Sequence, residues 1–366
     1  MKLAIDFVNT SLGSGTKTYN LNLIKQITKL KIKDIVYIFI TKNYFEEINT
    51  DKINNKKIKF IIKSNFFSNS FLRIIWMQII FPFELKLRKI DKLFSPMNIC
   101  PIIIKFLNIK IYLALHSNLP WKYFHFMPGN LIKRYLTKKL MEWSITCCDT
   151  LLVDSFFAKK EIIGFLKINK KKIKVIYLGC KKEKKIAKKY SPNYFLSVLS
   201  CVRYHNIINL LKAFKYIPQR YNINFYLVTQ ILDKDYYLEI KKFIKEHKLR
   251  NKVKIFKDLP SYRLPKLYKN SKFYIFTSYC EVFGLTTLEA MSYDCPILVA
   301  NRSALPEINS NAAEYFNPDD VAQIKRKMLK MINDKKLRKK LKNNSKIHLK
   351  KFSWTKTAIQ TLKILH

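Results

Sequence analysis

Short runs of β-branched and aromatic residues alternate with longer helical patterns along most of this chain. Stretches such as 18–30 and 158–167 carry helical patterns between these runs. Strands that alternate with helices are typical of parallel sheets in an α/β protein, so this is the fold class that we expect. The expected strands cover residues 2–8, 34–40, 57–62, 110–115 and 149–155, and then 193–200, 223–230, 252–256, 273–278 and 296–300.

The length of 366 residues favours two domains, each large enough to bury a core. Residues 181–193, "KKEKKIAKKYSPN", hold six lysines and a proline and have no apolar face, which is typical of a linker, although a solvated helix would look similar. We therefore expect one α/β domain over 1–182 and a second over 183–350. The remaining residues, 351–366, have the pattern of an amphipathic helix.

The formal charge of +45 requires nucleic acid and anionic membranes to be considered as partners. Residues 1–180 contribute 31 Lys/Arg against 11 Asp/Glu, and residues 181–366 contribute 39 against 14. Because the excess is spread evenly, in a chain rich in Lys, Ile and Asn and poor in Gly, it fits an AT-rich coding bias as well as a binding patch. We expect no specific nucleic-acid partner, and an anionic membrane surface remains an open alternative.

Cysteine usage and hydropathy indicate a cytoplasmic protein. The seven cysteines lack the paired spacing of zinc sites and are typical of small buried side chains in a reducing compartment. The opening "MKLAIDFVNT" carries Asp6 inside its apolar stretch and does not resemble a signal peptide. The apolar run 71–83, "FLRIIWMQIIFPF", is too short to span a bilayer and is broken by Arg73 and Pro82. We expect a soluble protein or one held peripherally at the inner face of the cytoplasmic membrane.

The segment 279–291, "YCEVFGLTTLEAM", places two glutamates around a glycine between an expected strand and an expected helix. A helix that starts near Leu285 would present free N–H groups and a positive dipole end beyond the strand, where a diphosphate could bind. Glu289, about one turn into the helix, could accept hydrogen bonds from a ribose diol, and Glu281 would face a sugar. Alternatively, both glutamates are surface acids without a function.

The longer string 281–318, "EVFGLTTLEAMSYDCPILVANRSALPEINSNAAEYFNP", resembles the nucleotide-binding signature of glycosyltransferase family 4, the group 1 glycosyltransferases. The resemblance implies the GT-B fold, with two Rossmann-like domains facing across a cleft and a C-terminal helix that crosses back to the first domain. It also implies a retaining reaction, with Glu281 as a catalytic residue. The donor-binding residues that it implies here are Phe283, Gly284, Leu285, Thr286 and Glu289.

Weaker matches to the same family lie in the first half of the chain. The stretch 10–27 resembles the family's glycine-bearing loop, with Gly13 and Gly15 near the donor, although an ordinary strand-to-helix turn would also account for it. "LALHSNLPW" resembles the strand-end histidine of the family and implies a catalytic role for His116, whereas a lone histidine is usually structural. "LLVDSFFAKKEI" resembles the family's serine region, with Ser155 at the strand end, and "FSWTKTA" resembles its closing helix.

One loop departs from the family pattern. Many members carry an arginine and a lysine after the first strand of the second domain, where they neutralise the leaving diphosphate. Here the aligned positions are Ser200 and His205, and Arg203 is the nearest cation. We expect Arg203 to take the catalytic phosphate contact and His205 to contribute to donor binding.

A DxD-like pair, Asp233 and Asp235, follows a strand in "LDKDYY". We interpret it as a helix cap rather than a metal site, and we expect neither metal nor cofactor.

The resemblance implies a hexosyltransferase that moves a sugar from a nucleoside-diphosphate sugar to a saccharide or lipid-linked saccharide, in the synthesis of a cell-surface polysaccharide such as lipopolysaccharide, O-antigen or capsule. Charge on the departing diphosphate would be stabilised by the helix end and Arg203. The alternatives are a nucleotide-sugar epimerase of the same fold and a non-catalytic sugar-nucleotide-binding relative. A nucleic-acid-binding protein is supported by charge alone.

Overall fold

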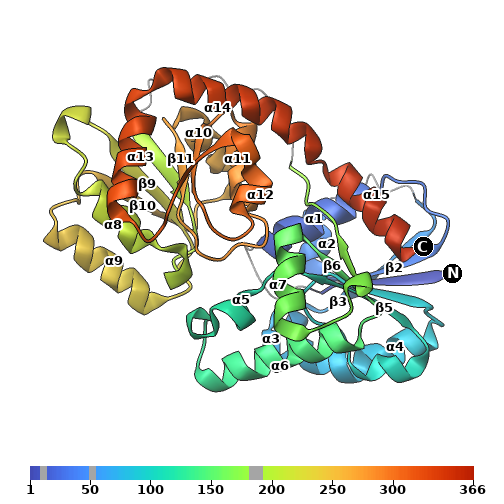
Figure 1. The fold of residues 1–366 in the computed structure, drawn as a ribbon. Coiled ribbons are helices and arrows are strands. Elements are labelled where there is room, and N and C mark those ends of the chain that lie inside the picture. The colour runs from blue at the N-terminus through green and yellow to red at the C-terminus, as the bar shows by residue number, and fades with distance from the viewer. Residues whose placement is uncertain (9–14, 49–54, 181–192) are drawn as a thin grey trace. The chain divides into compact units, whose positions relative to one another are not determined.

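The computed structural model describes residues 1–8, 15–48, 55–180 and 193–366, and the predicted linker lies almost entirely outside them (Figure 1). The described chain forms two compact units. The first comprises 1–121, 131–179 and 353–366, and the second comprises 122–130 and 180–352. Residues 122–130 therefore belong with the second unit, although the sequence analysis assigned them to the first domain. Within the second unit the ring of Tyr123 lies 6.5 Å from that of Tyr279.

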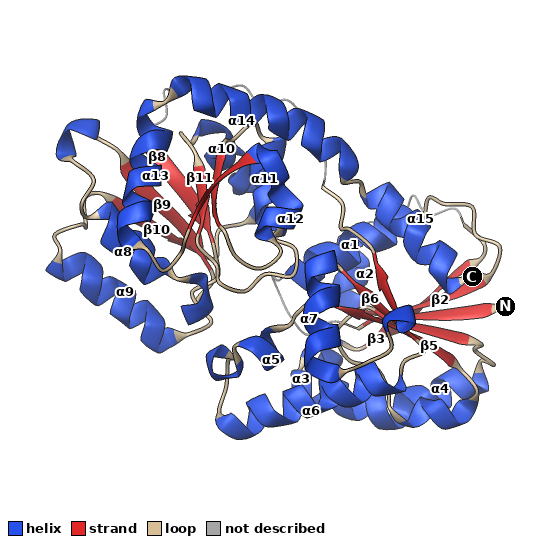
Figure 2. Ribbon diagram, in the orientation of Figure 1, coloured by secondary structure: helices blue, strands red, loops and turns tan. Residues whose placement is uncertain are grey.

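The first unit is built on a seven-stranded parallel sheet, called sheet A, with strand order β3-β2-β1-β4-β5-β6-β7 (Figure 2). Its central strands are buried on both faces, which is why they are mostly apolar rather than alternating. The strands are β1 (Lys2–Phe7), β2 (Ile35–Thr41), β3 (Ile58–Lys63), β4 (Lys92–Ser95), β5 (Lys110–Leu115), β6 (Thr150–Val153) and β7 (Ile173–Val175).

Helices cover both faces of sheet A. Since the strand order runs outward from β1 in one direction and from β4 in the other, right-handed crossovers put the two sets of helices on opposite faces. The helices are α1 (Gly15–Ile27), α2 (Lys42–Ile48), α3 (Ser70–Ile75), α4 (Phe81–Leu87), α6 (Leu131–Cys147), α7 (Phe156–Leu166) and α15 (Trp354–Leu365), with α5 (Leu119–Lys122) between β5 and α6.

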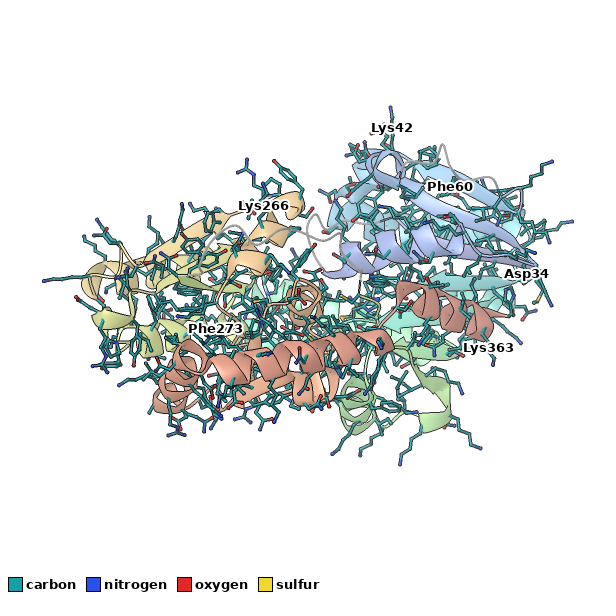
Figure 3. The ribbon with its side chains drawn as sticks, turned by 90° about the horizontal axis from the view of Figure 1, so that it is seen from above. Asp34, Lys42, Phe60, Lys266, Phe273 and Lys363 are labelled. Atoms are coloured by element: carbon teal, nitrogen blue, oxygen red, sulfur yellow. The ribbon has the colours of Figure 1, made fainter. Side chains whose placement is uncertain are left out.

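The second unit contains a six-stranded parallel sheet, sheet B, with order β10-β9-β8-β11-β12-β13. Its strands are β8 (Tyr194–Val198), β9 (Asn224–Thr229), β10 (Val253–Lys257), β11 (Tyr274–Phe276), β12 (Ile297–Ala300) and β13 (Ala313–Phe316). Its helices are α8 (Ile207–Phe214), α9 (Lys234–Glu246), α10 (Leu264–Asn270), α11 (Leu285–Ser292), α12 (Leu305–Asn309), α13 (Val321–Asn333) and α14 (Lys335–His348). Side chains such as Phe273 are buried, whereas Lys266 of this unit and Lys42 and Lys363 of the first unit are exposed (Figure 3).

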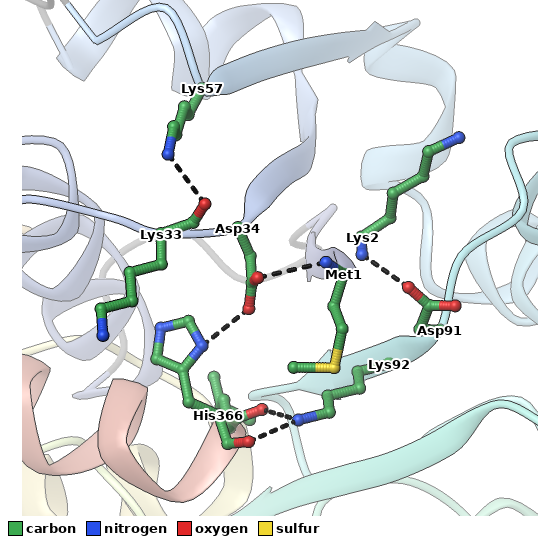
Figure 4. A network of polar contacts seen from close by, with 9 residues as sticks. Met1, Lys2, Lys33, Asp34, Lys57, Asp91, Lys92 and His366 are labelled. Carbon is green, nitrogen blue, oxygen red and sulfur yellow. Dashed lines mark hydrogen bonds and ion pairs between the residues drawn. The ribbon is translucent and has the colours of Figure 1, made fainter.

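The closing helix α15 is anchored on the first unit. A Cβ atom at Gly179 would lie 2.1 Å from the backbone nitrogen of Trp354, so only glycine lets the helix start there. The hydroxyl of Thr357 donates to the carbonyl of Tyr177 at 2.8 Å. At the other end, the buried ammonium of Lys92 donates to the carbonyl of Leu365 at 2.6 Å (Figure 4). A cation at this end of a helix is favoured by the helix dipole.

Three strands, β4, β7 and β13, were not predicted as strands. Each has only three or four residues. Lys92 opens β4 and Glu314 lies within β13, and these charges obscure the apolar pattern. Both are explained by contacts distant in sequence, because Lys92 bonds α15 and Glu314 pairs with Lys327 at 2.6 Å.

Candidate active site

Sheet B reverses its strand order between β8 and β11, and in open α/β sheets this switch point is where ligands bind. Two loops emerge there, residues 199–206 after β8 and residues 277–284 after β11. They are bonded to each other, because Tyr279 N–H donates to the carbonyl of Tyr204 at 2.8 Å and the Thr277 hydroxyl donates to that of His205 at 2.6 Å. The two loops therefore form one platform.

Gly284 ends the second loop and starts α11. Its backbone is left-handed, with φ +89°, and a Cβ there would lie 2.8 Å from Cδ2 of Leu305. Glycine alone adopts this conformation without cost. No side chain caps the helix and its first turn holds no acid, so the amides of Leu285 and Thr286 present the positive helix end that an anion prefers. Phe283, just before the glycine, is buried against Phe352, with the ring centroids 5.9 Å apart.

Glu281 and His205 meet across the platform. Nε2 of His205 lies 3.4 Å from a carboxylate oxygen of Glu281, and Nδ1 donates to the carbonyl of Ser200 at 2.6 Å. A carbonyl oxygen can only accept, so Nδ1 carries a proton and Nε2 is the atom that faces the glutamate. The Glu281 side chain remains 19% exposed, and its charge adds to burial in raising the pKa of Tyr204. This arrangement leaves the carboxylate held on one side and accessible on another.

Glu289 lies on α11 above two buried tyrosines. The Tyr268 hydroxyl donates to Oε2 of Glu289 at 3.4 Å, and the Tyr274 hydroxyl donates to the carbonyl of Val198 at 3.2 Å and accepts from the hydroxyl of Thr286 at 2.9 Å. Burial, and after it the Glu289 charge, raises the pKa of Tyr268, so this phenol stays protonated and donates. Burial also raises the pKa of Tyr274. The hydroxyls of the two buried tyrosines thus fix the side chains of Glu289 and Thr286.

Arg203 is not brought together with these glutamates. Its guanidinium lies 2.9 Å from Glu239 and 3.7 Å from Asp233, and it stacks over the ring of Tyr236 at 5.2 Å. Asp233 caps α9 by accepting from Tyr236 N–H at 2.9 Å, as the sequence predicted. Asp235 follows in the first turn of that helix. Both acids of the DxD-like pair therefore lie at the N-terminal end of α9.

At the carboxyl end of sheet A, both ring nitrogens of His116 have hydrogen-bond partners within the first unit. Nδ1 lies 2.8 Å from Asp154, Nε2 lies 3.1 Å from the carbonyl of Pro96, and Tyr19 packs on the ring at 4.4 Å. Both side chains of the pair are less than 10% exposed. Because carboxylates and carbonyls only accept, the geometry fits a ring that donates from both nitrogens. In this arrangement neither nitrogen is left for a substrate.

A second buried pair lies at the end of β1. Asp6 accepts from Arg73 at 2.9 Å, and Arg73 also donates to the carbonyl of Val8. Burial raises the pKa of Asp6, against the opposing charge of Arg73.

Of the two glycines predicted to approach the donor, Gly15 is the first residue of α1, and Gly13 lies outside the described residues. Ser155 caps α7 by accepting from Ala158 N–H at 3.0 Å.

Several of these groups have a weak signal in the sequence or none. Asp154 stands next to Ser155 at a strand end and could have been found by the reasoning that selected His116. Tyr268 and Tyr274 carry no sequence signal, because buried tyrosines are common and only the fold brings them under Glu289. Among the described residues, no group of three or more His, Cys, Asp or Glu side chains is arranged to hold a metal ion. Within the same residues, no helix combines the length and apolarity that a bilayer span requires.

The chain is similar to several known glycosyltransferases in sequence and in fold. Residues 180–348 match the family model described as "Glycosyl transferases group 1". The chain is 27% identical over 324 residues to the O-antigen chain mannosyltransferase RfbU of Salmonella typhimurium, covering 84% of each protein. It is 25% identical over 241 residues to the O-antigen chain mannosyltransferase B of Escherichia coli, covering 63% of each. The structure superposes on Anabaena Alr3699/HepE, solved with UDP-glucose, with a TM-score of 0.76 at 15% identity, over all of this chain and 99% of that one. The predicted α/β fold of the GT-B class is thereby confirmed.

Proposed function

Since residues 180–348 belong to the group 1 glycosyltransferases, we propose that this glycosyltransferase uses the carboxyl end of sheet B to bind a nucleoside-diphosphate sugar and moves the sugar, with retention, to a saccharide hydroxyl. The observation that carries the proposal is the assembly at one switch point of an uncapped helix end and two partly exposed carboxylates. Each of these groups suits one part of such a donor.

The diphosphate would bind at the start of α11. The amides of Leu285 and Thr286 offer hydrogen bonds, and the helix dipole favours the negative charge that grows on the leaving group. Glu289 would accept from the ribose hydroxyls, and its tether to Tyr268 keeps the carboxylate in place for this. Gly284 lets the loop approach the phosphates without a side chain in the way.

Glu281 would face the donor sugar, with His205 setting its position. A carboxylate near the anomeric carbon favours the positive charge that develops there as the bond to the diphosphate breaks. Arg203 could reach the phosphates only by leaving Asp233 and Glu239, so we assign it a smaller role than His205. We give His116 a positioning role, since its hydrogen bonds to Asp154 and Pro96 fix the end of β5.

Mannose is the first sugar to test, because the two curated relatives above are named O-antigen mannosyltransferases. We propose a saccharide or lipid-linked saccharide acceptor, cell-surface polysaccharide synthesis as the process, and the inner face of the cytoplasmic membrane as the location. A thermal-shift screen with UDP, GDP, ADP and CDP and their sugars tests the donor. A ligand at a hundred times its Kd stabilises the fold by about 2.7 kcal/mol. If no nucleotide stabilises the protein, the proposal fails.

A second candidate is a relative that binds the donor without transferring it. The observation that favours it is Arg203, the nearest cation in the departing loop, whose charge is already paired with two carboxylates. Release of nucleoside diphosphate from a bound donor in the presence of acceptor would exclude this candidate. Binding without release under all acceptors would favour it.

A further inference from the structure

The helical layer on one face of sheet A exposes an unusual amount of apolar surface. It consists of α3, a π-helical turn (Trp76–Ile80), α4, a 3-10 turn (Ile103–Leu107) and α6, and Figure 1 shows α3, α4 and α6 below the sheet of this unit. The sequence stretch "FLRIIWMQIIFPF" lies in this layer. We call the following exposed side chains the apolar face: Phe71, Ile74, Ile75, Ile79, Ile80, Phe83, Leu87, Ile103, Phe106, Leu131, Ile132, Tyr135, Leu136 and Trp143.

The elements of the apolar face are joined to one another. Gln78 in the π-helical turn donates to the carbonyl of Cys100 at 3.1 Å and accepts from Ile102 N–H at 2.9 Å. Ser144 of α6 accepts from Cys100 N–H at 3.1 Å. The segment before the 3-10 turn thus ties the α3–α4 region to α6, so the exposed side chains belong to one continuous layer.

Helix α6 contributes the part of this face that packs least on the core. Its buried residues are Met141, Ser144 and Ile145, all in its second half. In its first two turns Leu131 is 69% exposed and Leu136 is 61% exposed. Ile132, Tyr135 and Leu136 follow helical spacing and lie on one side of the helix. Packing in the core therefore does not explain why these positions are apolar.

The same layer is strongly basic. Its elements, residues 70–87, 103–107 and 131–147, hold seven Lys/Arg and two Asp/Glu. Both acids already have partners, because Glu84 pairs with Lys63 and Glu142 lies 3.2 Å from Lys139. Exposed lysines such as Lys86 and Lys105 stand between the apolar side chains. The charge of this layer therefore favours an anionic partner.

We propose that the apolar face docks on the surface of an anionic phospholipid bilayer, with its aliphatic and aromatic side chains in the headgroup region and its lysines on lipid phosphates. Apolar side chains flanked by cations, with Trp143, Tyr135 and Phe106 among them, have the composition of interfacial membrane-binding elements. The proposal adds a partner to the proposed function, since a lipid-linked acceptor would be met at such a surface. It rests on that function only in this respect.

Other partners fit the face less well. A second copy of this chain would bring two basic layers together, and like charges across an interface are unfavourable. A nucleic acid would stack on aromatic rings next to cations, whereas most side chains here are aliphatic. A bilayer uses both the aliphatic surface and the charge.

The experiment is flotation of the full-length protein with vesicles, without donor or acceptor. One set of vesicles contains phosphatidylcholine alone, and the other contains equal parts of phosphatidylcholine and phosphatidylglycerol. The test variant is Leu136→Gln, and its matched control is Leu238→Gln on α9 of the second unit, where the leucine has the same exposure of 61%. Both substitutions lie on exposed helix positions, and unfolding temperatures verify that both variants fold.

We expect binding to the anionic vesicles, about tenfold weaker for Leu136→Gln and weaker still when Ile132→Gln is added, because each lost side chain removes apolar burial in the membrane. Leu238→Gln should bind like the unchanged protein. Absence of binding would overturn the proposal. Equal effects of Leu136→Gln and Leu238→Gln would also overturn it and leave only diffuse charge attraction. Self-association of the unchanged protein that Leu136→Gln abolishes, measured by analytical ultracentrifugation, would instead assign the face to a second copy. If vesicle binding fails but a nucleotide still stabilises the protein, the proposed function stands and only the docking proposal is wrong.

Discussion

Charged side chains at the carboxyl end of sheet A form short, buried pairs, whereas Glu281 at the carboxyl end of sheet B forms a longer pair that is partly exposed. In sheet A, Asp6 bonds Arg73 and His116 bonds Asp154 at less than 3 Å, and each of the four side chains is less than 10% exposed. In sheet B, Glu281 lies 3.4 Å from its histidine and stays partly exposed. A short buried pair commits its members to the fold, because separating them leaves an uncompensated charge. A loosely held carboxylate remains free to bind a substrate, so the two edges should respond differently to mutation.

The largest effect should come from breaking a buried pair of sheet A. His116→Ala leaves Asp154 buried without its partner, which typically costs about 3–5 kcal/mol of unfolding free energy. The control is His366→Ala, which removes a His–Asp contact of 2.7 Å that is more exposed, and such contacts contribute about 0.2–1 kcal/mol. Urea unfolding measures both. A stable His116→Ala variant that binds nucleotide but has no turnover would contradict this assignment and make His116 catalytic.

The second comparison concerns two glycines. Gly284→Ala forces a side chain into a left-handed backbone and toward Leu305, with a backbone penalty of about 1–2 kcal/mol, and it should weaken nucleotide binding as the loop shifts. Gly164→Ala, in the middle of α7 with nothing within 4 Å of the new methyl group, should instead stabilise by about 0.5–1 kcal/mol. Thermal unfolding and nucleotide titration report both effects. Equal behaviour of the two variants would remove the argument for a strained turn at the site.

Arg203 tests the exception within sheet B, because it is paired like the groups of sheet A but is exposed. Arg203→Ala should cost less than about 1 kcal/mol of stability, as exposed pairs do, and should lower turnover less than His205→Ala. Steady-state kinetics on an identified donor compares the two variants. A greater loss of turnover for Arg203→Ala would mean that this side chain leaves Asp233 and Glu239 during the reaction.

The smallest effect concerns acid stability at the start of sheet A. Burial alone would raise the pKa of Asp34, but hydrogen bonds from the amino terminus and His366 outweigh it and hold the pKa below its usual value (Figure 4). Its contribution is present above the unfolded pKa of about 3.9 and is lost as the pH falls through the folded value. Unfolding between pH 5 and pH 3 should therefore show a slightly smaller loss of stability for Asp34→Asn than for the unchanged protein. An identical pH dependence would mean that the Asp34 contacts contribute nothing in solution.

The sequence predicted the α/β class and most of the strands because buried parallel strands leave apolar runs that any reader can see. The segment around Gly284 was also visible, since a glycine before a helix has few other uses in so glycine-poor a chain. The strands β4, β7 and β13 were missed because each has only three or four residues and carries a charged residue, and the partners of Lys92 and Glu314 are visible only in the structure. For the same reason the sequence could not separate Arg203, which pairs with α9, from His205, which pairs with Glu281. Exposure is equally invisible in the sequence, where the run 71–83 was identified only as too short to span a bilayer.

The most direct test of the account is calorimetric titration of UDP and GDP, and of their hexose derivatives, into the unchanged protein, Glu289→Ala and Glu281→Ala. We expect one nucleoside diphosphate to bind the unchanged protein and to bind Glu289→Ala at least tenfold more weakly, because each hydrogen bond to a charged acceptor contributes about 1.5–3 kcal/mol. Glu281→Ala should bind the free nucleotide normally and lose affinity for the nucleotide sugar. Unchanged affinities in Glu289→Ala, or equal losses of both ligands in Glu281→Ala, would contradict the assignment of the donor site to the carboxyl end of sheet B.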